Sequence, residues 1–557
     1  MESTRPWIAV YKELGLSWDR VPEVPAKTLS HYVREHAGQF REREALVFAG
    51  CGMSYETLDQ QADRLAHALQ SLGLMKGDVL GVHLPNVPQY VVAFVAAARL
   101  GVKLTSLSPL LRPAELGYQM DDAQVGVLLT FAPLLAQTGQ ACVGRSSLRA
   151  VIVTGPMDML EGGSGSCLET LEVPGVVTAH TFQELMAAQP NTAVPDAALV
   201  SDVLYLQYTG GTTGKPKGAE LSSYNLFCNN VQVDLFYGYR VGGETVASAF
   251  PYFHIGGAAV LFNGLRTAST NIVVPDPRDM AAMIGEMARR PPTVLAAVPA
   301  LFQMLVAQDE FRALNFDGLR IAISGAAPFT EAAIAELEQV VGQGRFWEVY
   351  GMTETSPVQT INPSSRIKFG FVGIPVPGTD LRIVDVETGT QVMPTGEPGE
   401  VIVSGPQVMR GYANRPEETA AALREHDGKL WMHTGDIGFL DAEGYLRICD
   451  RKKDMVIVGG YKVFSAEVEN KVAGLPGVGM CAVVGRADAE RPGNEVVCLF
   501  VQKAPDAPED AELEAQILAF CRDNMAPYKV PKEVSFVDGL PLTSVGKVDK
   551  LQLRERV

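Results

Sequence analysis

Apolar residues recur along the chain in two alternating patterns. Residues 55–72 carry them at helical spacing, while residues 79–84 and 125–130 are short apolar runs that end in turn residues. The same succession resumes after about residue 200, for example at residues 293–297 and 319–323. Helices that alternate with buried strands are typical of layered α/β structure. We therefore expect two successive α/β layers before about residue 380.

The pattern changes twice in the remaining chain. Between residues 381 and 446 the apolar runs shorten, as at residues 381–384 and 400–403, and Gly and Pro separate them, which indicates a small antiparallel sheet or barrel. After a charged cluster at residues 450–454, strand candidates at 481–484 and 496–501 predict a compact α+β unit. We place a domain boundary near Asp450.

Length and turn residues add to this division. A chain of 557 residues exceeds what one hydrophobic core usually supports, so two or more domains are expected. Residues 155–175, which contain Gly-Gly-Ser-Gly-Ser, and residues 189–196 have the composition of mobile surface loops. The second of them lies where two subdomains would join.

Charge and cysteine usage exclude several function classes. The chain has 47 basic and 64 acidic residues, a net charge of −17, which disfavours non-specific nucleic-acid binding and gives no attraction to anionic lipid. Its eight cysteines form no Cys-x-x-Cys pair, so neither a zinc site nor a disulfide framework is indicated. A reducing compartment is expected.

The ends of the chain and its most apolar stretch favour a cytoplasmic protein. The first residues lack the basic start and apolar core of a signal peptide, and the last residues are not a peroxisomal address. Residues 90–98 fall short of the roughly 20 apolar residues that a membrane-spanning helix requires. We expect no transmembrane segment, while peripheral membrane contact and a homodimer stay open.

The strongest chemical signal is the run Tyr-Thr-Gly-Gly-Thr-Thr-Gly-Lys-Pro-Lys-Gly at residues 208–218, directly after an apolar run. Glycine amides can approach an anion closely, threonines add hydroxyl donors, and lysines add positive charge. This is not a Walker loop, because Thr209 stands where that motif has glycine and Pro216 follows Lys215. The run predicts a phosphate-binding loop, with a flexible surface turn as the simpler alternative.

Two further clusters suit a nucleotide. In Tyr-Gly-Met-Thr-Glu at residues 350–354, the ring could stack on a purine, Thr353 could donate to a phosphate, and Glu354 could hold Mg²⁺. Taken alone, these five residues favour an ordinary loop. Ser-Gly-Ala-Ala-Pro at residues 324–328 follows an apolar strand, and ligands of α/β sheets bind at that end of a strand. A plain strand-to-helix connection explains this run equally well.

Three weaker signals complete the candidates. Asp436, in a Thr-Gly-Asp turn, could accept hydrogen bonds from both hydroxyls of a ribose, with Arg451 donating from the other side, although an Asp in a turn usually bonds its own backbone. His254 stands beside aromatic residues and glycines, where a packed core histidine is more common than a catalyst. Lys547, in a turn near the C-terminus, is on general grounds a solvated lysine.

Taken together, these motifs resemble the signatures of the adenylate-forming superfamily, which includes acyl-CoA synthetases, luciferases and peptide-synthetase adenylation domains. The resemblance spans nearly the whole chain, and the chain looks most like bacterial long-chain fatty-acid CoA ligases. Four runs match that branch: Leu-Gln-Tyr-Thr-Gly-Gly-Thr-Thr-Gly from residue 206, Pro-Arg-Asp at 277–279, Gly-Pro-Gln-Val-Met at 405–409 and Asp-Arg-Lys-Lys-Asp-Met at 450–455. The alanines of residues 324–328 depart from the glycines of that branch. Their methyl groups could shorten or reshape the acyl tunnel.

The resemblance implies an N-terminal AMP-binding domain at residues 1–449, with subdomains at about 1–200, 201–380 and 381–449. A hinge at 450–453 and a small mobile α+β domain at 454–557 would follow. It implies a pivot at Lys453 and a catalytic set of Lys547, Glu354, Thr209 and the substrate-contacting His254, with Glu354 as the Mg²⁺ ligand. The implied nucleotide contacts are Thr209, Gly210, Gly211, Thr212, Thr213, Gly214, Lys215, Lys217, Gly325, Ala326, Ala327, Pro328, Tyr350, Gly351, Thr353, Glu354, Asp436 and Arg451. The implied acyl pocket is Tyr252, Phe253, His254 and Gly256, and the implied CoA-binding loop is Gly459, Gly460, Tyr461 and Lys462.

The activity implied is a two-step ligation that uses ATP, Mg²⁺, a fatty acid of medium or long chain, and CoA as co-substrate. Another carboxylate CoA ligase, such as one for aryl acids, and a stand-alone enzyme that loads a carrier protein stay open as alternatives. From a different class, a catalytically silent nucleotide-binding homologue would be expected to lack Glu354 or Lys547, and both are present.

Overall fold

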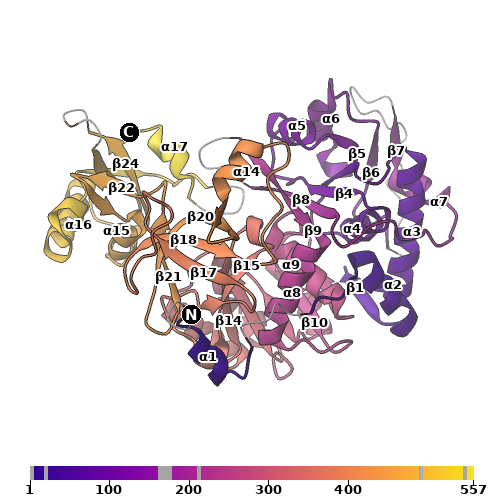
Figure 1. The fold of residues 1–557 in the computed structure, drawn as a ribbon, viewed down its shortest axis with the longest axis horizontal. Coiled ribbons are helices and arrows are strands. Elements are labelled where there is room, and N and C mark those ends of the chain that lie inside the picture. The colour runs from indigo at the N-terminus through magenta and orange to yellow at the C-terminus, as the bar shows by residue number, and fades with distance from the viewer. Residues whose placement is uncertain are drawn as a thin grey trace. The chain divides into compact units, whose positions relative to one another are not determined.

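The computed structural model describes residues 5–17, 23–160, 178–209, 215–488, 491, 494–542 and 548–557. These residues group into two compact units. The first unit contains the residues up to Asp380 together with Ser404–Leu423, and the second contains Leu381–Val403 and Arg424–Val557. Figure 1 shows the course of the chain.

The larger sheet of the first unit has a parallel centre. Its order is β16-β15-β14-β13-β12-β10-β11-β1-β2, and the strands from β14 to β1 run parallel, while β15, β16 and β2 are antiparallel additions at the two edges. Its strands are β1 (Glu44–Phe48), β2 (Cys51–Ser54), β10 (Thr245–Ser248), β11 (Thr270–Val273), β12 (Val294–Ala296), β13 (Ile321–Gly325), β14 (Phe346–Gly351), β15 (Val358–Asn362) and β16 (Ile374–Pro375).

The second sheet of this unit is parallel except at one edge. Its order is β7-β6-β5-β3-β4-β8-β9, and only the β8–β9 pair is antiparallel. Its strands are β3 (Val79–His83), β4 (Lys103–Ser106), β5 (Val125–Phe131), β6 (Ala150–Thr154), β7 (Ala179–Thr181), β8 (Val203–Thr209) and β9 (Lys217–Ser222).

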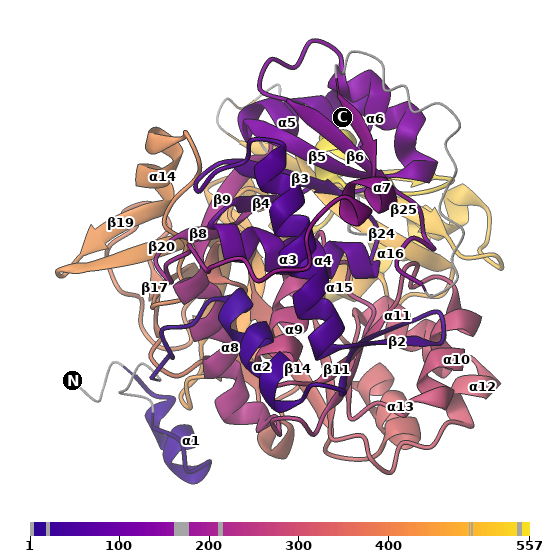
Figure 2. The same ribbon diagram turned by 90° about the vertical axis from the view of Figure 1, so that its right-hand side faces the viewer.

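Helices cover both sheets. They are α1 (Ile8–Glu13), α2 (Leu29–Gln39), α3 (Tyr55–Ser71), α4 (Pro88–Leu100), α5 (Pro113–Asp122), α6 (Leu135–Cys142), α7 (Phe182–Ala187), α8 (Ser223–Tyr237), α9 (Ile255–Arg266), α10 (Met280–Arg289), α11 (Pro299–Val306), α12 (Asp309–Arg312), α13 (Glu331–Val341) and α14 (Pro416–Ala422), with short 3₁₀ turns at η2 (Ala132–Leu134), η3 (Thr353–Thr355) and η4 (Ser364–Arg366). Helix α4 packs beside α2 and α3 (Figure 2), and all of its residues are buried. Its continuous apolar run therefore belongs to a core helix.

The second unit starts with a five-stranded sheet of order β17-β18-β20-β19, with β21 paired to β20. The β18–β20 and β20–β21 pairs are antiparallel, and Trp431 packs with Val384 and Ile402 in a small core. The strands are β17 (Asp380–Val384), β18 (Gly399–Ser404), β19 (Leu423–His426), β20 (Lys429–Leu440) and β21 (Leu446–Arg451).

The C-terminal residues add an α+β assembly with its own core. Apolar residues of helices α15 and α16 pack on those of strands β24 and β25. The elements are β22 (Val456–Val458), β23 (Tyr461–Val463), α15 (Ser465–Val472), β24 (Val478–Ala487), β25 (Glu495–Lys503), α16 (Asp510–Asn524), η5 (Pro527–Lys529), β26 (Glu533–Val537) and α17 (Lys550–Arg554).

The predicted fold class is confirmed, since layered α/β sheets are followed by a small antiparallel sheet and an α+β segment. The predicted helix at residues 55–72 is α3, and every strand candidate named above falls on a strand. The contacts divide the chain at Leu381, because the five-stranded sheet groups with the C-terminal residues. The domain boundary and hinge near Asp450 stay a prediction.

The expected surface loop at residues 189–196 is present, because these residues contain no helix or strand after the end of α7 and most of them are exposed. The loop is anchored at Val194, which is buried. Its amide donates to Asp63 Oδ1 at 2.8 Å, and Arg34 donates to the Val194 carbonyl and pairs with Asp196 at 2.8 Å. Charged side chains far away in the sequence anchor this segment. The other predicted loop comprises residues 155–175, and residues 161–175 of it lie outside the described residues.

Two findings bear on compartment. In the described part of the chain, the cysteines at 51, 142, 228, 449, 481, 498 and 521 are all free thiols. No helix among the described residues is both long and apolar enough to cross a bilayer.

Candidate active site

The predicted phosphate loop connects β8 to β9 at an edge of the seven-stranded sheet. β8 runs parallel to β4, whereas β9 returns antiparallel, and their pairing extends to Thr209 opposite Lys217. The loop therefore opens at the carboxyl end of a strand, where ligands of α/β sheets bind. Gly210, Gly211, Thr212, Thr213 and Gly214 lie outside the described residues.

Aromatic rings hold the two lysines that follow. The Lys215 ammonium lies 5.1 Å from the centre of the Tyr118 ring, and the Lys217 ammonium lies 5.3 Å from that of Tyr412. The Tyr118 hydroxyl also donates to the Pro216 carbonyl at 3.0 Å. A ring face attracts a cation and restricts its position, so both positive charges are held where the loop ends.

Glu354 joins this group through Tyr412. Its carboxylate is buried in η3 and accepts a hydrogen bond from the Tyr412 hydroxyl at 2.7 Å. The main chain around Tyr412 is fixed as well, because the Ala413 amide donates to the Gly218 carbonyl at 2.8 Å and the Met409 amide to the Glu354 carbonyl at 2.8 Å. The candidate Mg²⁺ ligand and the strand after the phosphate loop are thus tied together.

Glu354 is the candidate ligand for Mg²⁺. Among the described residues, no group of three or more His, Cys, Asp and Glu side chains could hold a metal ion. Mg²⁺ does not require such a cage, because it is usually bound by one or two carboxylates, with phosphate oxygens and water completing the octahedron. A single fixed carboxylate at Glu354 fits an ion that arrives with a nucleotide triphosphate.

The other two nucleotide motifs lie side by side. β13 and β14 run parallel, with Gly325 opposite Val349, so residues 324–328 and Tyr350 follow neighbouring strand ends. A Cβ atom at Gly325 would lie 2.9 Å from the Val349 carbonyl oxygen, so only glycine fits this close approach. Ala326, Ala327, Pro328 and Gly351 are exposed, Tyr350 and Thr353 are half-buried, and together they leave an open edge of small side chains beside an aromatic ring.

A buried carboxyl group lies directly behind this edge. Glu348 of β14 is opposite Ser324 in the sheet, and its side chain is buried. Burial raises the pKa of Glu348 to about 7, opposed in part by hydrogen bonds from the Asn362 side chain, at 3.4 Å, and the Phe329 amide. This carboxyl group therefore titrates near neutral pH.

The predicted acyl-pocket turn is held by side chains of the neighbouring sheet. Asn86 accepts from the Tyr252 amide at 2.7 Å, and Gln207 of β8 donates to the Phe253 carbonyl at 3.1 Å. His254 caps α9, because its Nδ1 accepts from the Gly256 amide at 3.1 Å, which leaves Nε2 to carry the proton of the neutral ring. His254 therefore caps the N-terminus of α9. Its ring is half-buried and lies in the turn that follows β10.

The predicted ribose residues meet in the second unit. Asp436 of β20 and Arg451 of β21 are opposite each other in the ladder, and Arg451 Nε lies 3.1 Å from Asp436 Oδ1. Asp436 is buried, whereas about half of the Arg451 side chain is exposed. Lys453, two residues further on, is half-buried, and burial lowers its pKa to about 8.

The predicted CoA loop is a tight hairpin between β22 and β23. Gly459 and Gly460 have φ angles of +58° and +81°, as a two-residue hairpin with positive φ at both positions requires. The Gly459 amide donates to Asn494 Oδ1 at 2.9 Å. Tyr461 is exposed and stacks on Tyr528 at a centroid distance of 4.6 Å, while Lys462 pairs with Ile457 in the ladder.

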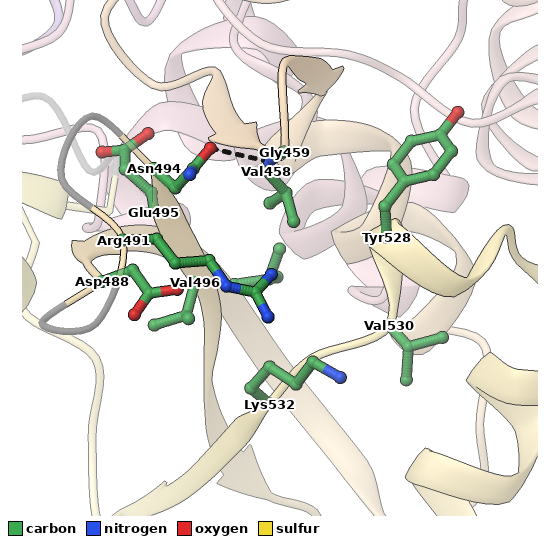
Figure 3. Close-up of a pocket in the computed structure, with 11 residues that line it drawn as sticks. Val458, Gly459, Asp488, Arg491, Asn494, Glu495, Val496, Tyr528, Val530 and Lys532 are labelled. Carbon is green, nitrogen blue, oxygen red and sulfur yellow. Dashed lines mark hydrogen bonds between the residues drawn. The ribbon is translucent and has the colours of Figure 1, made fainter.

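A cavity of about 80 Å³ lies beside this hairpin. Gly459 and Tyr528 line it, and the side chains of Arg491 and Lys532 point into it, Arg491 from the segment between β24 and β25 and Lys532 from the segment before β26 (Figure 3). Two cations therefore lie next to the glycine hairpin, and the carboxylates of Asp488 and Glu495 also line the cavity. Lys547 lies outside the described residues, although Leu542 and Val548 on either side of its turn form a β-bridge.

Sequence reasoning missed Tyr412, Tyr118 and Asp122. The Tyr208 hydroxyl donates to Asp122 Oδ2 at 2.8 Å, and Arg415 pairs with the other oxygen of the same carboxylate. No local motif marks Tyr118 or Asp122, because they precede the loop by many residues. For Tyr412, the nearby Gly-Pro-Gln-Val-Met run was a signal, but it did not indicate which side chain reaches Glu354.

Comparison with known proteins agrees with this geometry. Residues 33–413 match the AMP-binding enzyme family, and residues 467–547 match the AMP-binding enzyme C-terminal domain. The chain is 34% identical over 572 residues to the long-chain-fatty-acid–CoA ligase of Bacillus subtilis, covering 100% of this chain and 98% of that protein. It is 32% identical to the feruloyl-CoA synthase of an Amycolatopsis species, covering 92% and 95%.

A solved structure agrees as well. ATP-bound MatB from Rhodopseudomonas palustris superimposes with a TM-score of 0.80 at 29% identity, covering 95% of this chain and 99% of that one. Both domain models and near full-length relatives therefore match, and the chain belongs to the AMP-binding family of adenylate-forming enzymes.

Proposed function

We propose that this protein is an AMP-forming fatty acid–CoA ligase that acts on acids of medium or long chain. It would join the acid to AMP with release of pyrophosphate and then transfer the acyl group to CoA. A carboxylate resists attack by a thiol, because its oxygen is a poor leaving group, and the mixed anhydride with AMP removes this obstacle.

One observation carries the proposal. The buried Glu354 carboxylate is fixed by the Tyr412 hydroxyl at 2.7 Å, and the same Tyr412 ring holds the Lys217 ammonium at 5.3 Å. Tyr412 thus holds both groups near the strand that follows the glycine-rich loop. The Glu354 carboxylate suits a cation bound to phosphate, and the Lys217 ammonium suits phosphate oxygens.

In the first step, a carboxylate oxygen of the acid attacks the α-phosphorus of ATP, the bond from that phosphorus to the β-phosphate oxygen breaks, and pyrophosphate leaves. Mg²⁺, when bound at Glu354, would neutralise negative charge on the phosphates. Thr209, Thr212, Thr213 and Thr353 would donate hydrogen bonds to the phosphate oxygens, and Lys547 would stabilise the charge that develops in the transition state. Tyr350 and the small side chains of residues 325–328 would hold the adenine.

In the second step, the CoA thiolate attacks the acyl carbon, the bond to the AMP oxygen breaks, and AMP leaves. The hairpin of Gly459 and Gly460 would guide the thiol arm, and the adjacent cavity with Arg491 and Lys532 would hold phosphate groups of CoA. Because one site must serve two partners, the residues after Lys453 would turn about it between the steps.

The relatives support a CoA ligase but differ in acid. The Bacillus subtilis relative is named for long-chain fatty acids, whereas the Amycolatopsis relative is named for an aromatic acid. The fatty acid is preferred because the motifs quoted above resemble that branch of the family. The aromatic acid remains the second candidate, since the alanines at 326 and 327 add methyl groups at the edge of the site.

The test measures pyrophosphate and AMP release by the purified protein with Mg-ATP and a panel of acids from acetate to long-chain fatty acids and aromatic acids, with and without CoA. We expect CoA-dependent turnover that is highest with medium or long fatty acids. Turnover restricted to aromatic acids would overturn the substrate class. Adenylate formation that ignores CoA would instead indicate a carrier-protein acceptor, and silence with every acid would favour the catalytically silent homologue.

Two variants test the assignment of the steps. Lys547→Ala should abolish adenylate formation and largely spare thioester formation from preformed acyl-AMP, and an equal loss of both would contradict its role. Lys453→Pro should trap one conformation and so impair one step, whereas normal rates in both steps would contradict the hinge.

A further inference from the structure

A buried set of polar contacts connects the residues before the predicted hinge with those after it. Asp450 lies at the end of β21, and its carboxylate is only 7% exposed. Its two oxygens accept from one residue, Ser465 at the start of α15, Oδ2 from the Ser465 amide and Oδ1 from the Ser465 hydroxyl at 3.0 Å. Ser465 is completely buried.

Helix α17, at the C-terminal end of the chain, completes these contacts. The Lys550 ammonium donates to Ser465 Oγ at 2.6 Å and pairs with Glu469 of α15 at 2.7 Å. Burial raises the pKa of Asp450, and the positive charge of Lys550 opposes this rise. Asp450, Ser465 and Lys550 therefore form a continuous chain of hydrogen bonds in a poorly hydrated place, where such bonds are strong and costly to break.

One turn further along the same helix, Arg554 binds the hinge itself. Its guanidinium donates to the Lys453 carbonyl at 2.9 Å and pairs with Asp454 at 2.6 Å. Lys550 and Arg554 are four residues apart, so they lie on one face of α17. This face is turned toward residues 450–454, and α17 begins three residues after Lys547.

We infer that Asp450, Ser465 and Lys550 form a latch that closes across the hinge and must open whenever the C-terminal residues turn about Lys453. The inference rests on the proposed two-step function.

The partners divide at Lys453. Asp450 is paired with Ile437 in the β20–β21 ladder and would stay with that sheet, while Ser465 and Lys550 would move with the C-terminal residues. The contacts of Arg554 behave differently, because the Lys453 carbonyl and Asp454 both lie beyond the Lys453 Cα atom and travel with α17. Arg554 thus fixes α17 relative to the residues just after Lys453. The latch instead opposes the rotation of the residues after Lys453 until its hydrogen bonds break.

All three residues of the latch belong to the compact unit that contains the five-stranded sheet and the C-terminal residues. Opening the latch would take both Ser465 donors away from the buried Asp450 carboxylate until water or new partners replace them, whereas Lys550 would keep Ser465 and Glu469. The strength of the latch therefore sets the relative populations of the two conformations, and through them the relative rates of the two half-reactions.

Lys550→Met tests the latch, and Lys529→Met is its matched control. Lys529 pairs with Glu467 at 2.6 Å, so both lysines hold an acidic residue of α15, but the control pair lies entirely after the hinge. Ser465→Ala is a milder second variant, since it keeps the amide contact, and Lys550→Arg should restore the latch in part. Thermal unfolding verifies that each variant is folded.

The first measurement is the initial rate of tryptic cleavage after Lys452 and Lys453 in the ligand-free full-length protein. We expect cleavage at least fivefold faster in Lys550→Met than in the parent or in Lys529→Met. Equal rates in Lys550→Met and Lys529→Met would overturn the latch. This readout does not require enzyme activity, so it remains decisive if the proposed function fails.

The second measurement compares acid-dependent ATP–pyrophosphate exchange with thioester formation from preformed acyl-AMP. We expect the ratio of these two rates to shift at least fivefold in the same direction in Lys550→Met and Ser465→Ala, and to stay constant in Lys529→Met. Equal loss of both half-reactions would overturn the latch, because a merely structural role would lower them together. Silence of the parent protein in both assays would contradict the proposed function alone.

Discussion

Replacing Glu348 with glutamine should make the stability of the protein less dependent on pH. The residue is 8% exposed in the middle of β14, opposite Ser324. Glutamine keeps its shape and its ability to accept the hydrogen bonds from Asn362 and the Phe329 amide. What the substitution removes is the ionisation of a buried carboxyl group.

The sign follows from the two pKa values. The carboxyl pKa is 4.5 in its ordinary state and about 7 in the folded protein, so between these values the folded state binds more protons than the unfolded state. Unfolding free energy therefore falls as pH rises from about 4.5 to 7, and above pH 7 the whole contribution is lost. The difference corresponds to about 3 kcal/mol, of which about 1.4 kcal/mol is lost between pH 6 and 8.

The assay is thermal unfolding of the parent, Glu348→Gln and Glu331→Gln at pH 6, 7 and 8. Glu331 is exposed in the first turn of α13 and controls for the loss of one charge. We expect the Glu348→Gln protein to gain about one to two degrees in Tm over the parent as the pH rises from 6 to 8, because the entropy of unfolding is large for a unit of this size, while Glu331→Gln stays parallel to the parent. A constant difference between Glu348→Gln and the parent at all three pH values would refute the reasoning.

Three other substitutions test contacts of the site and the core. Tyr412→Phe removes the hydroxyl that donates a charge-assisted hydrogen bond to Glu354. It should slow ATP–pyrophosphate exchange about tenfold, which corresponds to about 1.4 kcal/mol of activation free energy. An unchanged rate would show that this bond does not position the carboxylate. Arg99→Met removes a buried guanidinium that pairs with both Asp59 and Asp63, and since Arg34 still pairs with Asp63, it should cost about 3 kcal/mol, so a parental Tm would contradict it. Lys532→Ala should raise the KM for CoA and leave the exchange rate unchanged, and a loss of exchange would place Lys532 elsewhere in the cycle.

The local elements of this protein followed from its sequence. The helix at α3 and the strands β3, β5, β13 and β25 were predicted because apolar periodicity reports which face of an element is buried. The position of the phosphate loop directly after a strand followed for the same reason, whereas the strand β9 that follows the loop was not predicted. Each of these features depends on residues that are neighbours in the chain.

Partners far apart in sequence required the tertiary structure. Tyr412 and Glu354 are 58 residues apart, Arg554 and Asp454 are 100 apart, and the anchoring of residues 189–196 depends on Arg34. The order of strands in a sheet decides which side chains meet, and periodicity carries no information about that order.

The sequence by itself therefore determined the α/β elements, the family and the motifs, because each is written in short stretches of residues. Only the tertiary structure decided that Asp436 and Arg451 form an ion pair on neighbouring strands, that Tyr412 binds Glu354, and that α17 reaches back to Lys453. The physical reason is that these contacts depend on how sheets and helices pack, and packing brings together residues whose separation along the chain is arbitrary.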